Sequence, residues 1–213
     1  MSSTRHEEHV LDVAALKALA HPLRTRLWDA LMSGPATASQ LGQLLGESSG
    51  ATSYHLRQLA RHGFIEEVPD RGTARERFWR ATERETRITR DAVSTPSGRA
   101  ALAIFGDEWL KLRFESAARY QQMRRQDLVP GPWAGAAVEM ATTFVATADE
   151  LAELVADLQA VIEAWHDRVE GRDGTEPGTS PVELQLRAFP RSIPAATPTA
   201  PHGAATTEHR SQP

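Results

Sequence analysis

Small, hydroxyl and basic side chains recur at the spacing of one helix face in the N-terminal half of the chain. Ser49, Gly50, Ser53, Tyr54 and Arg57 share this face when the segment is helical. Hydroxyl and guanidinium groups hydrogen-bond base edges and phosphates, and small residues in the first turns let a helix end approach a groove closely. The partial positive charge of a helix N-terminus favours the same anionic target. The pattern therefore predicts contact with duplex nucleic acid.

Two helices joined by a tight turn must position this face. The first spans 37–45, with a hydroxyl residue, Thr37, at its start and Gly46 at its end. The second begins at Ser48 or Ser49 and runs to about residue 62, and we expect partial burial and a hydrogen bond for His55. Its inner face is predicted to consist of Thr52, Leu56 and Leu59.

A β-hairpin follows this pair of helices. The segments 64–68 and 75–80 are rich in β-favouring residues, and the Pro, Asp and Gly residues of 69–74 are typical of a hairpin tip. The hairpin places three arginines at or near its tip, namely Arg71, Arg75 and Arg77. The order helix, turn, helix, hairpin predicts a winged helix-turn-helix.

Three stretches of the chain resemble the ArsR-like winged helix-turn-helix regulators. They are LAHPLRTRLW, similar to the second helix of that family, SYHLRQL, similar to its recognition helix, and HGFIEEV, similar to its first wing strand. The resemblance covers about residues 12–85 and implies a DNA-binding transcriptional repressor. It also implies that Ser49, Gly50, Ser53 and Tyr54 face bases, whereas Arg57, Arg71, Arg75 and Arg77 face phosphates.

The composition is that expected of a cytoplasmic regulator that needs no cofactor. The 213 residues include no cysteine, which excludes disulfides, thiolate metal sites and cysteine nucleophiles. No apolar run has the length of a membrane span, and the first residues lack the apolar core of a signal peptide. We therefore expect no membrane association. The partner expected from the winged helix-turn-helix is double-stranded DNA.

The net charge of −4 is divided unevenly along the chain. Residues 1–98 carry 13 Lys and Arg against 12 Asp and Glu, whereas residues 99–189 carry 9 against 15. Within 48–90, 9 arginines face 6 carboxylates, so the predicted contact region has a small positive surplus that a dimer doubles. We therefore expect strongly salt-dependent binding through two half-sites.

The fold class predicted for the whole chain is mainly α with a small β component. Residues 1–95 form the winged helix-turn-helix, 99–190 a C-terminal α/β region for dimerisation or effector binding, and 191–213 a disordered tail rich in Pro, Ala, Thr and Ser. The α/β region is predicted as helix, strand, helix, strand, with a long helix over 99–126, a non-helical loop at 129–133, strands within 138–145 and 181–190, and a capped helix from Thr147.

Two roles for the second half follow from its apolar stripes. The long helix is expected to pack on its own sheet and on the same helix of a second copy, which gives a homodimer with recognition helices about one DNA turn apart. The alternative adds a pocket for a small-molecule effector between that helix and the sheet. Its candidate lining is Phe105, Trp109, Trp133, Met140, Phe144 and Trp165, although aromatic stripes are more often plain core.

Three other classes of function have less support in the sequence. A metal sensor lacks its usual parts, because the 37–45 helix has no cysteine pair and the long helix has no histidine. An enzyme is not indicated, since none of the common catalytic motifs occurs. A winged-helix protein-interaction module without DNA binding stays open, but it predicts an acidic or bulky apolar outer face in place of serine, tyrosine and arginine.

Overall fold

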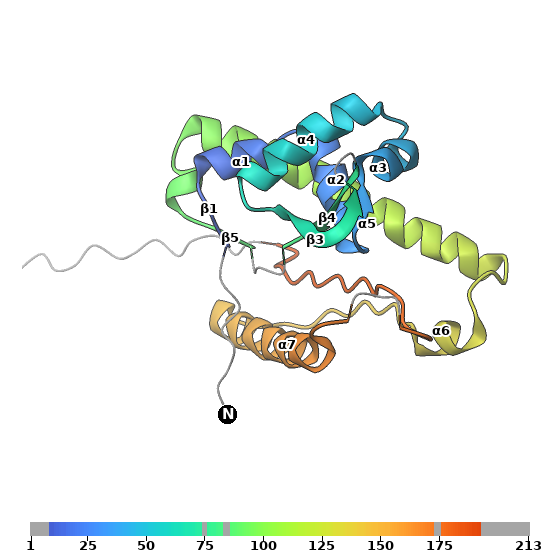
Figure 1. The fold of residues 1–213 in the computed structure, drawn as a ribbon. Helices are drawn as coiled ribbons and strands as arrows, with labels where there is room; N and C mark the ends of the chain where they lie inside the picture. Colours follow the sequence, from blue (N-terminus) through green and yellow to red (C-terminus); the bar gives the residue numbers. More distant parts are fainter. Residues whose placement is uncertain (1–8, 74–75, 83–85, 173–175, 193–213) are drawn as a thin grey trace, which may run out of the picture.

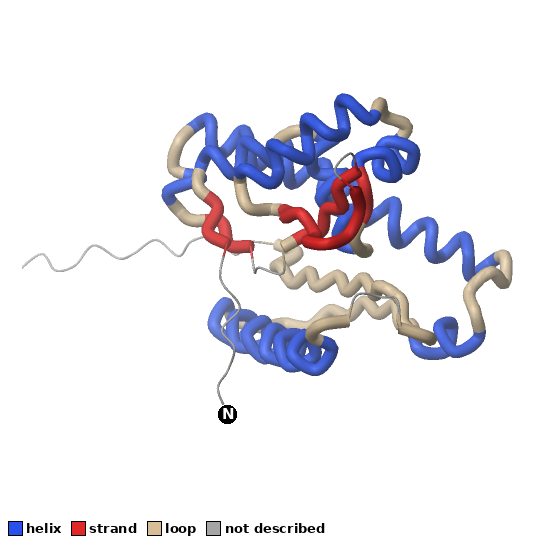
Figure 2. Tube along the Cα trace, viewed as in Figure 1, coloured by secondary structure: helices blue, strands red, loops and turns tan. Residues whose placement is uncertain are grey.

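The computed structural model describes residues 9–73, 76–82, 86–172 and 176–192. Helices dominate the fold, and strands are confined to a small sheet and one short strand pair in the N-terminal half (Figures 1 and 2). The N-terminal half contains β1 (His9–Leu11), α1 (Val13–Leu19), α2 (Pro22–Met32), β2 (Ala36–Thr37), α3 (Ala38–Leu45), α4 (Ser49–Arg61), β3 (Ile65–Thr73), β4 (Glu76–Ala81) and β5 (Thr86–Ile88). A 3₁₀ turn η1 (Asp91–Val93), the long helix α5 (Pro96–Arg125), α6 (Gly131–Ala136) and α7 (Ala148–Val169) follow. None of the helices among these residues is long and apolar enough to cross a membrane.

Local signals start each of the first three helices. The Asp12 carboxylate accepts a hydrogen bond from the Ala15 N–H at 2.7 Å and caps α1, and Pro22 occupies the first turn of α2, where its missing N–H costs nothing. Thr37 and Gln40 form a capping box at the start of α3. The apolar faces of these helices meet in one core, whose fully buried members include Leu16, Leu19, Leu27, Leu41, Leu56, Leu59 and Phe64.

The predicted hairpin is present, and a third strand joins it. Strands β3 and β4 pair antiparallel, and β2 adds to the other edge of β4 to give the order β2-β4-β3. The register shifts between Glu67 and Gly72, so the pairing is irregular there and resumes at Gly72 and Thr73. Trp79 of β4 is buried against the helices and anchors the sheet to the core. A separate parallel pair, β1 with β5, ties the N-terminal segment to the chain that follows the hairpin.

Helix α5 is shared between the two halves of the chain. Its N-terminal part packs on α1 and α2, where the Phe105 and Trp109 rings lie 6.3 Å and 5.4 Å from the Trp28 ring. Its C-terminal part extends away from the helical cluster (Figure 1). The segment 94–98, where the composition changes, joins η1 to α5 in a packed turn. Ala92 before this segment and Gly98 at its end are both buried.

The prediction of two strands in the second half is wrong. Residues 137–147 and 179–190 have an irregular backbone without strand pairing, and Figure 2 shows them as loops. Apolar alternation supplies a side-chain pattern, but a strand also requires a neighbour to pair its N–H and C=O groups, and no described residue provides one for these segments. The predicted helices are present as α5 and α7, so this region is mostly helical.

The loop predicted at 129–133 contains the start of a short helix. Helix α6 begins at Gly131 and includes Pro132 in its first turn, a position where the fixed φ of proline suits a helix and no N–H is needed. The segment predicted to be non-helical therefore contains the first turn of a helix. The tail beyond Ser192, predicted to be disordered, lies outside the described residues.

Candidate nucleic-acid interface

The turn between α3 and α4 is tight because one glycine, Gly46, occupies the turn and another, Gly42 of α3, packs closely against it. Gly46 adopts the left-handed region at φ 71° and ends α3, and its N–H bonds the Gly42 carbonyl. A Cβ on Gly42 would lie 2.8 Å from the Glu47 carbonyl oxygen and 3.3 Å from Thr52 Oγ1. The Ser48 hydroxyl then accepts from the Ala51 N–H at 3.2 Å and starts α4. This turn sets the angle at which α4 leaves the core.

The predicted division of α4 into two faces agrees with its burial. Thr52, Leu56 and Leu59 are fully buried against the core. Of the residues predicted to contact bases and phosphates, Ser49, Gly50 and Arg57 are exposed, Tyr54 is 53% exposed and Ser53 is half-buried. The first turn of α4 contains no acidic residue. The outer face is therefore accessible and polar, and no residue of α4 itself carries a negative charge toward an approaching anion.

The hairpin β3–β4 forms the wing, and its described arginines are exposed. Arg77 Nη1 lies 3.0 Å from Glu67 Oε2 in an exposed ion pair. The Arg71 guanidinium lies 4.8 Å from the centre of the Phe78 ring. Because exposed ion pairs are worth little, Arg77 can exchange Glu67 for a phosphate at small cost. Arg75, the third predicted wing contact, lies outside the described residues.

His55 of α4 packs against His21, and the sequence predicted the burial of His55 but not this contact. His55 is half-buried, as expected, and its ring centre lies 4.5 Å from that of His21, the residue before α2. The hydrogen bond predicted for His55 is not found. The Nδ1 atoms of His21 and His55 are both buried without a partner among the described residues. Burial lowers the pKa of both imidazoles, and the nearby Arg24 guanidinium lowers each further. Tyr54 packs edge-on against His55 at 5.1 Å, so this pair touches the outer face.

The six residues proposed for an effector pocket do not gather at one place. Phe105 and Trp109 pack together against the core. Met140 is 81% exposed, and Phe144 and Trp165 are each more than half exposed. Only Trp109 lines the cavity found between α5 and the C-terminal segment. No three His, Asp or Glu side chains in the described part of the chain are placed to hold a metal ion.

A family model described as a helix-turn-helix domain matches residues 19–68, the stretch from the end of α1 to the first strand of the wing. None of the curated proteins matches the sequence. Among solved structures, apo ZitR of Lactococcus lactis shows 14% identity and a TM-score of 0.31 over 68% of this chain and 83% of its own. AdcR of Streptococcus pyogenes shows 12% identity and a TM-score of 0.30 over 70% and 81%. FabT of Streptococcus pneumoniae, in complex with DNA, shows 18% identity and a TM-score of 0.28 over 68% and 75%.

Because these TM-scores and identities are low, the classification depends on the family match and on the local geometry. The match spans α2, α3, the glycine turn and α4, and the β3–β4 hairpin supplies the wing. A helix-turn-helix is a DNA-binding domain and not a catalytic one. Residues 19–68 therefore match the helix-turn-helix domain family, and with the β3–β4 wing they form a winged helix-turn-helix, the domain class of DNA-binding transcriptional regulators.

Proposed function

We propose that the chain is a homodimeric, sequence-specific transcriptional repressor of the cytoplasm that inserts α4 into the major groove of a palindromic operator. The observation that carries this proposal is the exposed face of α4, whose buried face fixes it to the core while Tyr54 and Arg57 project outward. In helix-turn-helix proteins the second helix enters the groove and its N-terminal residues contact base edges. Ser49, Gly50, Ser53 and Tyr54 occupy those positions, and Arg57, Arg71, Arg75 and Arg77 are assigned to phosphates.

A dimer is needed because one short helix contacts few base pairs. Two half-sites separated by one helical turn multiply both affinity and specificity, and a two-fold dimer presents two equal recognition helices to them. The long helix α5 leaves Ile104, Leu110 and Phe114 at least 45% exposed. Apolar residues repeated on one helix in this way favour a protein partner. In this proposal residues 1–95 contact DNA and residues 99–190 hold the dimer together.

Selection of bound fragments from randomised duplex DNA tests the proposal directly. We expect a two-fold palindrome with half-site centres about 10 base pairs apart. Binding to the selected sequence should exceed binding to a scrambled duplex by about 1,000-fold or more. Sedimentation of the complex should show two chains per duplex. No enrichment, with equal weak binding to both duplexes, would instead support a winged-helix module that serves a protein partner.

Substitutions on the outer face of α4 are expected to change sequence preference. Tyr54→Ala and Ser53→Ala each remove a side chain assigned to base edges, and one good base contact contributes about 1–3 kcal/mol of discrimination. We therefore expect each variant to lose about 10- to 100-fold of discrimination at one operator position, while affinity for scrambled DNA stays close to wild type. Repeating the selection with each variant measures this, and an unchanged base preference at every position would move the base contacts elsewhere.

Removing a wing arginine is expected to weaken binding to all sequences alike. If Arg77 contacts one phosphate in each half-site, Arg77→Ala lowers the slope of log affinity against log salt by about 0.9 per half-site. The matched control is Lys111→Ala, which removes one exposed charge per chain on α5, away from the wing. Titrations of both variants across a salt series provide the comparison. Equal slopes for wild type and Arg77→Ala would show that the wing does not touch the backbone at this residue.

A further inference from the structure

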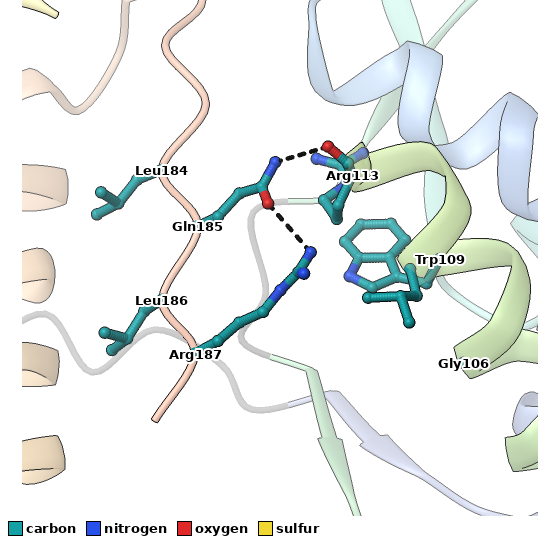
Figure 3. Close-up of a pocket in the computed structure, with 8 residues that line it drawn as sticks. Gly106, Trp109, Arg113, Leu184, Gln185, Leu186 and Arg187 are labelled. Carbon is teal, nitrogen blue, oxygen red and sulfur yellow. Dashed lines mark hydrogen bonds between the residues drawn. The ribbon is translucent and has the colours of Figure 1, made fainter. Parts of the chain in front are cut away.

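A cavity of about 380 Å³ lies between α5 and the irregular segment that follows α7 (Figure 3). Its volume is in the range of sites that hold small molecules. One side is formed by α5 and the other by four consecutive residues near the end of the described chain. The lining residues are Gly106, Trp109, Leu110, Arg113, Leu184, Gln185, Leu186 and Arg187.

The two sides of the cavity differ in polarity. Gln185 and Arg187 point toward α5, whereas Leu184 and Leu186 point away from it (Figure 3). Gln185 Nε2 donates to the Arg113 carbonyl at 3.0 Å and to Glu183 Oε1 at 2.5 Å, and its Oε1 accepts from Arg187 Nη2 at 3.1 Å. The α5 side supplies apolar surface through Trp109 and Leu110. A molecule held here therefore meets the Arg187 guanidinium on one side and an indole on the other.

The two arginines at the cavity differ in how their charges are balanced. Arg113 is largely buried, with its guanidinium 4.3 Å from the centre of the Trp109 ring, and it is paired with two carboxylates, Asp29 and Glu183. Arg187 forms no ion pair with any described carboxylate, and its guanidinium lies 5.2 Å from the centre of the Phe114 ring. The spare positive charge of the cavity thus belongs to Arg187, and a carboxylate is a group that a guanidinium binds well through paired hydrogen bonds.

Gly106 leaves space at the α5 side of the cavity. A glycine inside a helix destabilises it by about 0.5–1 kcal/mol relative to alanine, so its presence in the middle of α5 is unfavourable for the helix itself. A Cβ placed on Gly106 would meet no atom within 4 Å. Packing inside the described chain therefore does not require glycine here, and the open space is available to a bound molecule.

We propose that this cavity binds a small organic anion with a flat apolar body, such as an aromatic carboxylate. Its carboxylate pairs with Arg187, whose guanidinium is held by Gln185 Oε1, and its ring lies against Trp109 and Leu110. The site differs from the six-residue pocket expected from the sequence, with which it shares only Trp109.

The cavity is connected to the DNA-binding domain through Arg113. Asp29, one of its two partners, belongs to α2, which packs on α4. Glu183, the other partner, belongs to the segment that carries Gln185 and Arg187. An anion that draws Arg187 and Gln185 toward itself also changes the position of Glu183 and competes for Arg113. The expected consequence, which rests on the proposed function, is that the ligand changes operator affinity.

Calorimetric titration of the full chain with 2-naphthoate tests the binding site. We expect saturable binding with one site per chain, and at least tenfold weaker binding of 2-naphthamide, which has the same ring system without the charge. Arg187→Gln should weaken 2-naphthoate binding at least tenfold and leave the weak binding of 2-naphthamide nearly unchanged. Gly106→Leu fills the cavity and should weaken both, with thermal unfolding used to confirm that the variant is folded. Absence of binding to wild type, or equal binding to wild type and Arg187→Gln, overturns the site.

Operator binding in the presence of 2-naphthoate tests the connection to DNA. The affinity for the selected operator should change at least fivefold in wild type at saturating 2-naphthoate and stay constant in Arg187→Gln. A wild type that binds its operator but not 2-naphthoate refutes the cavity site and leaves the proposed function intact. A wild type that binds 2-naphthoate but no DNA sequence refutes the proposed function alone. Binding of both with no mutual effect refutes the connection through Arg113.

Discussion

Gly98→Ala is expected to destabilise the protein by about 3 kcal/mol, at the upper end of the range for overpacking substitutions. Gly98 is buried in the first turn of α5, and a Cβ there would overlap the Ala92 carbonyl oxygen and lie 2.9 Å from the Ala92 carbonyl carbon. These are backbone atoms of η1, and Ala92 is itself only 1% exposed, so neither side can yield without moving a packed turn. The Thr95 hydroxyl, which accepts from the Gly98 N–H at 3.0 Å, would also be displaced.

Denaturant and thermal unfolding measure this effect. For a chain of this size, the predicted loss corresponds to a fall in melting temperature of roughly 6–12 °C. The matched control is Gly106→Ala in the same helix, where the new Cβ meets nothing within 4 Å. That substitution should leave stability unchanged or raise it by about 0.5–1 kcal/mol, because alanine favours the helix. Equal melting temperatures for Gly98→Ala and wild type would show that α5 and η1 do not pack as described.

Lowering the pH below about 6.5 is expected to destabilise the fold through His21 and His55. Burial is the largest cause that lowers the pKa of each imidazole below the ordinary value of 6.5, and Arg24 adds to it in both cases. His21 itself lowers the pKa of His55, whereas Glu47 raises it. The unfolded chain then takes up protons at a higher pH than the folded protein. The contribution of the two histidines to the free energy of unfolding is therefore fully present above pH 6.5. It is lost as the pH decreases toward the folded pKa values.

The slope of stability against pH is the quantity to measure. Each histidine can contribute at most about 1.4 kcal/mol per pH unit, and solvent screening of these partly buried rings holds the slope below that ceiling. The double variant His21→Gln, His55→Gln should lose less stability between pH 7.5 and 5.5 than wild type. His166→Gln removes an exposed histidine of α7 and should keep the wild-type slope. If the double variant and wild type lose stability equally, the acid sensitivity arises elsewhere.

Tyr54 contacts the His55 ring, so the same acidification should reach the outer face of α4. Two cationic rings 4.5 Å apart, beside Arg24, repel one another and push α4 away from the start of α2. Loss of operator affinity at low pH is therefore expected to accompany loss of stability.

The helix-turn-helix and the wing could be predicted from the sequence because their signals act over a few residues. Thr37 caps α3 through a residue three positions away, Gly46 adopts the conformation that ends the helix, and Ser48 starts the next one. The apolar period of α4 is likewise local, since every third or fourth residue returns to the same face. Interactions of this range are nearly independent of the rest of the fold, and the predicted inner face of Thr52, Leu56 and Leu59 agrees with the structure.

The second half was predicted less well because its structure depends on distant partners. Alternating apolar residues at 181–190 favour a strand, but the backbone groups need a paired neighbour that the described chain does not supply. The packing of Trp28 against Phe105 and Trp109, and the contact of His21 with His55, likewise join residues far apart in sequence.

The sequence by itself determined the helix-turn-helix with its glycine turn, the outer face of α4 and the wing, because caps, turns and periodicity are properties of neighbouring residues. Only the tertiary structure decided that α5 begins inside the DNA-binding core at a glycine with no space for a side chain. The same holds for Arg113, which joins Asp29 of α2 to Glu183 across most of the chain. These features depend on which surfaces meet after folding, and pairings over such separations leave no local pattern that one sequence could reveal.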